Sequence, residues 1–225
     1  MRYRQVEKRA RKPTSIARKH STSILFPYAR PAMDSTEVVD GWAHELAILS
    51  EILLERGYSP LVRCPASGAP ALCATASDVE KAQVLVFVEP RAKVGIGSLR
   101  HAAEEAARMG STRIIMLAAE GATPFVLREL KNAGGKYEQL SIEIFRRSEL
   151  AFNVLRHCLV PKHRVLSGRD RRALLSSIGC RLHMLPRIRS DDPVAKLLGA
   201  SPGALLQIER TIGHAEVEIY YRVVV

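Results

Sequence analysis

The sequence lacks any apolar run close to the ~20 residues that a membrane-spanning helix needs, and it has no stretch with the shape of a signal peptide. We therefore expect a soluble intracellular protein. Cysteine is also scarce, because four cysteines are spread at irregular spacings over 225 residues. This pattern favours a reducing compartment in which none of them is paired.

Acidic residues are outnumbered by basic ones, 23 to 34, and the formal net charge is +11. The excess is uneven along the chain. Residues 1–33 hold nine Lys and Arg against one acid, whereas residues 34–147 have a net charge of −2 and residues 148–225 have a net charge of +5. The basic character therefore belongs mostly to an N-terminal tail. Because this tail has no sustained periodicity, we predict that residues 1–40 are disordered.

The tail contains the run KRARKP at positions 8–13, which has three possible interpretations. Its composition is typical of a nuclear localisation signal or a phosphate-binding patch. It is equally compatible with a merely solvated arm. A mitochondrial transit peptide is the third interpretation, since the tail is rich in Arg and Ser and almost free of acids.

Residues 41–147 are predicted to form a mixed α/β domain. Four apolar residues at helical spacing, from Trp42 to Leu53, indicate a helix that ends at Gly57. Residues 59–82 are a weakly specified loop or hairpin. The rest alternates between strands and helices, predicted at 84–88, 98–109, 113–118, 123–132 and 140–145. This order predicts a parallel or mixed sheet with helices packed on it, and the helix at 123–132 is expected to be capped by Thr123 with Pro124 at its first position.

Residues 148–225 are predicted to form a small two-layer α/β domain. Ser167 and Asp170 form a capping-box pattern that opens a helix ending at Gly179, and three apolar residues of that helix are expected to face a core: Leu174, Leu175 and Ile178. Asp192 and Pro193 open a second helix, which ends at Gly199.

The same segment contains three extended stretches. Residues 182–188 are expected to form an edge strand because they contain Pro186, and 204–211 and 217–225 are expected to be strands around a turn at Gly213. A domain of about 75 residues has little core of its own, so a partner surface would stabilise it.

Five short segments occur here in a fixed order: LVPKH at 159–163, LPRI at 185–188, DPVAKLLG at 192–199, GALLQIER at 203–210 and EIYYRVVV at 218–225. This series resembles the C-terminal assembly domain of the fifth-largest subunit shared by eukaryotic RNA polymerases I, II and III. A similar domain stands alone as a small subunit of archaeal RNA polymerase. The resemblance is dense over residues 149–225.

The middle domain more loosely resembles the N-terminal jaw domain of the eukaryotic subunit. The RGY-like turn of that domain is matched by Arg56-Gly57-Tyr58, its VGV-like turn by Val94-Gly95-Ile96, and its TP pair by Thr123-Pro124. The lysine that often follows the VGV-like turn is replaced by Gly97. Because the archaeal subunit lacks a jaw, the chain is similar to the eukaryotic type.

The resemblance implies a non-catalytic subunit of a nuclear DNA-dependent RNA polymerase, without a cofactor or bound metal. Its C-terminal domain would dock on the largest subunit, and its jaw would lie beside downstream duplex DNA. The candidates for docking are Pro161, Lys162, His163, Leu185, Pro186, Arg187, Ile188, Asp192 and Pro193. For proximity to DNA, the resemblance implies Thr123 and Pro124, and we add the cations Arg91, Lys93 and Arg100 because phosphates attract basic groups. Which of the three polymerases the chain serves is left open.

Three other functions have weaker patterns in their favour. Cys158, His163, Cys180 and His183 have a spacing that could be mistaken for a zinc site. A metal-dependent nuclease would use Asp78, Glu89 and Lys93, but three residues separate the last two where that pattern has one. The third possibility is a free-standing nucleic-acid-binding protein that uses the basic tail.

Overall fold

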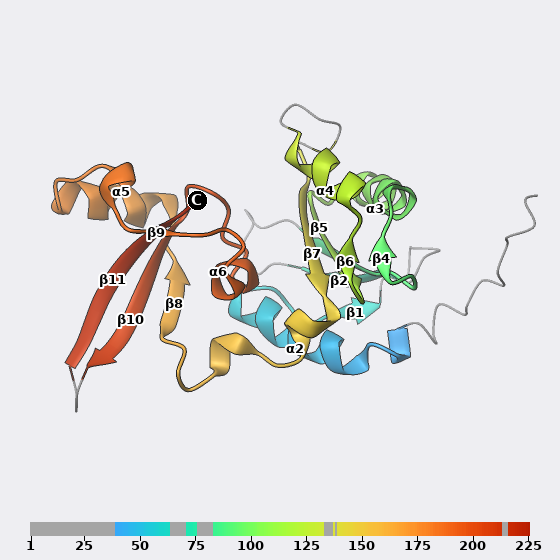
Figure 1. Cartoon of the computed structure of the whole chain (residues 1–225), viewed down its shortest axis with the longest axis horizontal. Coiled ribbons are helices and arrows are strands. Elements are labelled where there is room, and N and C mark those ends of the chain that lie inside the picture. Colours follow the sequence, from blue (N-terminus) through green and yellow to red (C-terminus); the bar gives the residue numbers. More distant parts are fainter. Residues whose placement is uncertain (1–38, 64–70, 76–82, 133–136, 138, 213–215) are drawn as a thin grey trace, which may run out of the picture. The chain divides into compact units, whose positions relative to one another are not determined.

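The computed structural model describes residues 39–63, 71–75, 83–132, 137, 139–212 and 216–225 (Figure 1). The predicted basic tail therefore lies outside the described residues, apart from its last two positions, and the turn at Gly213 lies outside them as well. None of the described helices is long and apolar enough to cross a membrane.

The larger of two main sheets, called the large sheet here, is mixed and has the strand order β1-β2-β3-β5-β7. The strands β3, β5 and β7 are parallel, whereas β1 and β2 pair antiparallel. The bounds are β1 Val62–Arg63, β2 Ala71–Ala74, β3 Val84–Val88, β5 Arg113–Ala118 and β7 Ser141–Arg146. This confirms the predicted α/β class and shows that the uncertain segment 59–82 contributes a pair of strands.

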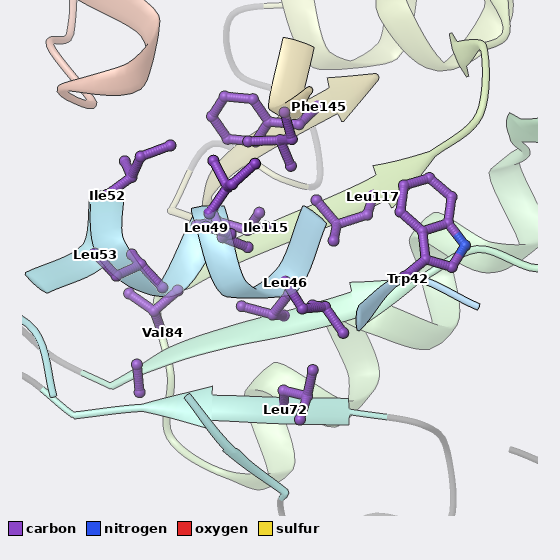
Figure 2. Packing of buried hydrophobic residues seen from close by; sticks show 14 of the residues in the cluster. Trp42, Leu46, Leu49, Ile52, Leu53, Leu72, Val84, Ile115, Leu117 and Phe145 are labelled. Atoms are coloured by element: carbon purple, nitrogen blue, oxygen red, sulfur yellow. The ribbon is translucent and has the colours of Figure 1, made fainter. Parts of the chain in front are cut away.

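Helix α2 (Ala43–Glu55) covers one face of the large sheet. Its apolar side chains fall three or four residues apart, so they share one face and pack on alternate residues of the strands. Figure 2 shows Leu49 beside Ile115 and Phe145, and Leu53 beside Val84. Gly57, with a φ of 84°, then ends the helix as predicted.

Helices α3 (Ile96–Arg108) and α4 (Pro124–Lys131) cover the opposite face. Leu99, Ala102 and Ala106 of α3 are buried there, as expected from their spacing. Thr123 occupies the N-cap position of α4, but within the described part of the chain its hydroxyl makes no capping hydrogen bond, so the predicted side-chain cap is wrong. Pro124 instead fixes the first helical position through its restricted φ.

Two short strands, β4 (Lys93–Val94) and β6 (Gly121–Ala122), form a separate parallel pair that the sequence pattern did not indicate. A two-residue strand is too short to show alternation. The Thr123 N–H donates to the Val94 carbonyl at 3.1 Å, so this pair holds the starts of α3 and α4 next to each other.

The small sheet has the strand order β8-β10-β11-β9 and lies in the C-terminal part of the chain. Its centre is the antiparallel pair β10 and β11, and β9 joins β11 in parallel. The bounds are β8 Lys162–Val165, β9 Arg187–Ile188, β10 Leu205–Ile212 and β11 Glu216–Val224. Helices α5 (Gly168–Ser177) and α6 (Pro193–Leu197) accompany it, with 3₁₀ turns at Arg147–Leu150, Val154–Arg156 and Leu182–Met184.

The predicted starts of α5 and α6 are confirmed. The Ser167 hydroxyl accepts from the Asp170 N–H at 3.1 Å, and the Asp192 carboxylate accepts from the N–H groups of Val194 and Ala195 at 2.9 and 3.3 Å. Each cap satisfies backbone donors that have no partner within the helix.

Two predictions in this region are wrong. Residues 182–184 form a 3₁₀ turn, because only Arg187 and Ile188 reach β11 and the preceding residues have no strand to pair with among those described. Helix α5 buries none of its side chains against the described residues, and Ile178 is 46% exposed. The small core of the sheet is filled by α6 and the segment after it, and Leu174 and Leu175 of α5 are only partly buried.

Candidate functional site

Arg56, the residue that directly follows α2, connects the large sheet to α6. Its guanidinium donates two hydrogen bonds to the two carboxylate oxygens of Glu143 on β7, at 3.0 and 2.8 Å. It also donates to the carbonyls of Leu197 and Lys196 at 2.8 and 2.9 Å. The side chain of Arg56 is only 6% exposed, so this cation is placed where it satisfies both a largely buried carboxylate and the C-terminal carbonyls of α6.

The second residue after α6 fits closely against this arginine. Gly199 has a φ of 65°, which favours glycine, and a Cβ added there would lie 3.0 Å from the Cζ and Nη1 atoms of Arg56. Lys196 strengthens the same contact, because its ammonium lies 2.6 Å from Glu149 and over the ring of Phe145. We refer to Arg56, Glu143, Lys196 and Gly199 as the clamp.

A second buried carboxylate holds α2 to the chain that follows β7. Burial raises the pKa of Glu45 and is the largest single influence on it. The hydrogen bond from Arg147 at 2.6 Å, a backbone hydrogen bond and the positive charges of Arg147 and His44 together outweigh burial, so the pKa lies below its ordinary value. Arg147 also donates to the Gly41 carbonyl at 2.7 Å and stacks over Trp42.

The register of the small sheet places two candidate docking residues on one face. In the strand register, Lys162 lies opposite Glu209, which lies opposite Ile219 on the next strand. Arg187 lies opposite Val223, which lies opposite Leu205. Residues 205 and 209 are an even number of positions apart on β10, so their side chains point to the same face of the sheet. Lys162 and Arg187, which lie in register with them across the sheet, therefore share that face. Val217 and Ile219 lie on the same face and are 58% and 51% exposed.

We call Lys162, Arg187, Val217 and Ile219 the docking face. It combines two exposed cations on opposite edge strands with an uncovered apolar pair near the end of the hairpin. Neither cation has an ion-pair partner among the described residues. Their positions on one face could not be seen in the sequence, and Val217 and Ile219 were expected only as strand residues. The sequence signal that could have identified them is the alternation of apolar and polar residues that begins VEIYY at 217–221.

The other docking candidates contribute mainly to local structure. Asp192 caps α6, Pro193 begins it, and Ile188 packs in the small core. The Pro186 carbonyl accepts from the Val223 N–H at 2.8 Å, and a ring nitrogen of His163 lies 2.6 Å from the Pro161 carbonyl. Leu185 is half-buried beside this edge. The structure therefore does not bring all nine candidates together in one cluster.

The candidate DNA-proximal residues lie around the paired starts of α3 and α4. Thr123 and Pro124 begin α4, Lys93 belongs to β4, and Arg100 lies in the second turn of α3. Arg91 is exposed in the loop before β4. Neither first turn, both of which lie in the described residues, carries an acid, so the positive ends of two helix dipoles are uncompensated there. Lys93 is the weakest candidate because it pairs with Glu120 at 3.2 Å.

The alternative sites find no geometric support in the described part of the chain. It holds no group of three or more His, Cys, Asp and Glu side chains that could bind a metal ion. Of the nuclease candidates, Asp78 lies outside the described residues, whereas Glu89 is buried and accepts from the Arg91 N–H at 3.3 Å.

Comparison with known proteins yields matches in the C-terminal region and across most of the chain. Residues 152–224 match the family described as RNA polymerase Rpb5, C-terminal domain. A Caenorhabditis elegans protein named DNA-directed RNA polymerases I, II, and III subunit RPABC1 is 29% identical over 177 residues, which cover 79% of this chain and 82% of the relative. The Dictyostelium discoideum protein of the same name is 30% identical over a match that covers 63% of this chain and 72% of the relative.

The archaeal match is stronger but shorter. The Pyrococcus horikoshii protein named DNA-directed RNA polymerase subunit Rpo5 is 47% identical over 74 residues, which cover 33% of this chain and 90% of the relative. All three relatives are thus named as subunits of DNA-directed RNA polymerases. The chain belongs to the Rpb5 family of these subunits.

Proposed function

We propose that the chain is a non-catalytic, structural subunit of a nuclear DNA-directed RNA polymerase and that its small sheet docks on the largest subunit. The observation that carries this proposal is the coincidence of the family match at 152–224 with a sheet that leaves Val217 and Ile219 exposed. An assembly domain needs such a surface, because its own core is too small to supply much stability. The comparisons do not support a free-standing nucleic-acid-binding protein.

Within the docking face, Arg187 is the residue best suited to a specific contact. Its exposed guanidinium lies on an edge strand, where it can form a two-bond contact with a carboxylate of the partner. Val217 and Ile219 would supply apolar contact area further along the same face, six and four positions before Val223 on β11. We assign Lys162 a secondary role at the opposite edge.

The paired starts of α3 and α4 form the part of the jaw that we place beside downstream duplex DNA. Two helix N-termini with Arg91 and Arg100 nearby can attract phosphates without reading the sequence. Because residues 34–147 have a net charge of −2, this contact would guide the duplex and add little affinity.

Reversing the charge at Arg91 and Arg100 together is expected to weaken the hold of the polymerase on downstream duplex. The slope of log affinity against log salt should fall by about 2, since each lost phosphate contact contributes about 0.9. Purified polymerase carrying Arg91→Glu and Arg100→Glu can be titrated with duplex at several salt concentrations. Lys131→Glu, at the other end of α4, is the matched control. An unchanged slope in the double variant would remove these cations from the DNA contact.

A further inference from the structure

A groove of about 590 Å³ runs along the outer edge of β7. Leu127 and Leu130 of α4 form one wall, and Ser201 and Pro202, in the segment between α6 and β10, contribute to the other. Ile142 and Ile144 of β7 line the groove between these walls. Leu127 is 46% exposed, so part of this apolar lining is open to solvent.

The backbone of β7 has unused hydrogen-bonding groups in this groove. The Ser141 N–H donates to the Thr112 carbonyl at 2.8 Å, toward β5, so residues 141, 143 and 145 direct their backbone groups to β5. The backbone groups of Ile142 and Ile144 therefore point outward, because they alternate along a strand. Among the strands in the described residues, none pairs with this edge.

The end of the same edge is closed by a side chain. The Arg146 N–H also points outward, and the Glu149 carboxylate accepts from it at 3.0 Å. The open edge is therefore limited to the backbone groups of Ile142 and Ile144, which would accommodate one short strand. An unpaired strand edge is a template for adding another strand.

The position of the edge decides what can occupy it. A second copy of this chain has its own β7 recessed between the same two walls, so the two edges could not meet. A single extended peptide needs only one strand spacing, about 4.8 Å, beside β7. The groove's own charges are largely balanced, since Glu143, Glu149 and Asp191 pair with Arg56, Lys196 and Arg189. Arg146 is exposed and has no ion-pair partner in the described part of the chain, so it favours an acidic group on the occupant.

We propose that this groove binds one extended segment of a neighbouring polymerase subunit, which adds to β7 as a sixth strand and carries an acidic side chain opposite Arg146. This inference rests on the proposed function, since it requires the chain to be assembled in a polymerase. The apolar side chains of the segment would contact Leu127 and Leu130. Its backbone would form hydrogen bonds with the outward-pointing N–H and C=O groups of Ile142 and Ile144.

Amide hydrogen exchange tests the proposal directly. The exchange of the Ile142 and Ile144 amides is measured in the free chain and in natively purified polymerase that contains it. We expect exchange in the polymerase to slow by about tenfold or more, because each amide gains a strand hydrogen bond. Ser201→Trp, which fills the groove, and Arg146→Glu, which reverses its free charge, should each restore the faster exchange. The matched controls are Ser148→Trp and Arg128→Glu, whose positions do not line the groove.

The possible outcomes separate the two proposals. If the chain does not purify with polymerase subunits, the proposed function is wrong. If it does, but the two amides exchange at the rate of the free chain, only the groove proposal fails. It also fails if Ser201→Trp and Arg146→Glu leave the protection intact, or if protection in the free chain rises with its concentration, since a second copy would then be the occupant.

Discussion

Replacing Arg56 with alanine is expected to lower the free energy of unfolding by about 3–5 kcal/mol, because it leaves the Glu143 carboxylate and two α6 carbonyls without their donor. For a chain of this length, this corresponds to a fall in melting temperature of roughly 10 °C. Arg56→Lys should recover only part of the loss, since an ammonium cannot match the two oxygens of Glu143 and reach the carbonyls of α6 together.

The control for this variant is Arg63→Ala. Arg63 also pairs with an acid, Asp40, but the distance is 3.6 Å and the two side chains are 60% and 71% exposed. An exposed pair of this kind contributes about 0–1 kcal/mol, so its loss should scarcely change the melting temperature. The measurement is thermal unfolding followed by circular dichroism. Equal melting temperatures for Arg56→Ala and Arg63→Ala would show that the clamp does not stabilise the fold.

A second large effect is expected when Arg187 is replaced by alanine, this time on assembly and not on folding. If Arg187 contacts a buried carboxylate of the largest subunit, its removal leaves that group unpaired and costs roughly 2–5 kcal/mol of docking free energy. Because Arg187 is exposed and only its backbone takes part in the described hydrogen bonds, the free chain should fold normally. Arg187→Lys should assemble to an intermediate extent.

Competition between tagged chains measures this effect. Variant and wild-type chains carrying different tags are expressed together, and their ratio is determined in the purified polymerase. Arg187→Ala should be largely excluded, whereas Arg172→Ala should compete equally, since Arg172 is an exposed residue of α5 that lines neither the groove nor the docking face. Equal incorporation of Arg187→Ala would identify Arg187 as a residue without a role at the interface.

The sequence predicted those elements whose boundaries depend on neighbouring residues. Asp192 and Pro193 start α6, and β3 and β5 have the predicted bounds, because caps, proline and short apolar runs act locally. Residues 182–184 were predicted incorrectly for the complementary reason. Whether they extend depends on a strand partner, and β11 offers one only to residues 187 and 188.

The candidate site was predictable residue by residue but not as an arrangement. The motifs singled out Arg187 and Lys162, yet their position on one face with Ile219 follows from the register of four strands. Arg56 was recognised only as part of a turn. Its partners Glu143 and Leu197 lie 87 and 141 residues further along the chain, a separation at which local patterns carry no information about contacts.

Native purification of the tagged full-length chain from nuclei, with mass-spectrometric counting of the associated subunits, tests the proposed polymerase role most directly. We expect one copy of this chain for each copy of the largest RNA polymerase subunit, in a complex that withstands salt and nuclease treatment. Recovery of the chain alone, or with nucleic acid that nuclease removes, would contradict this role.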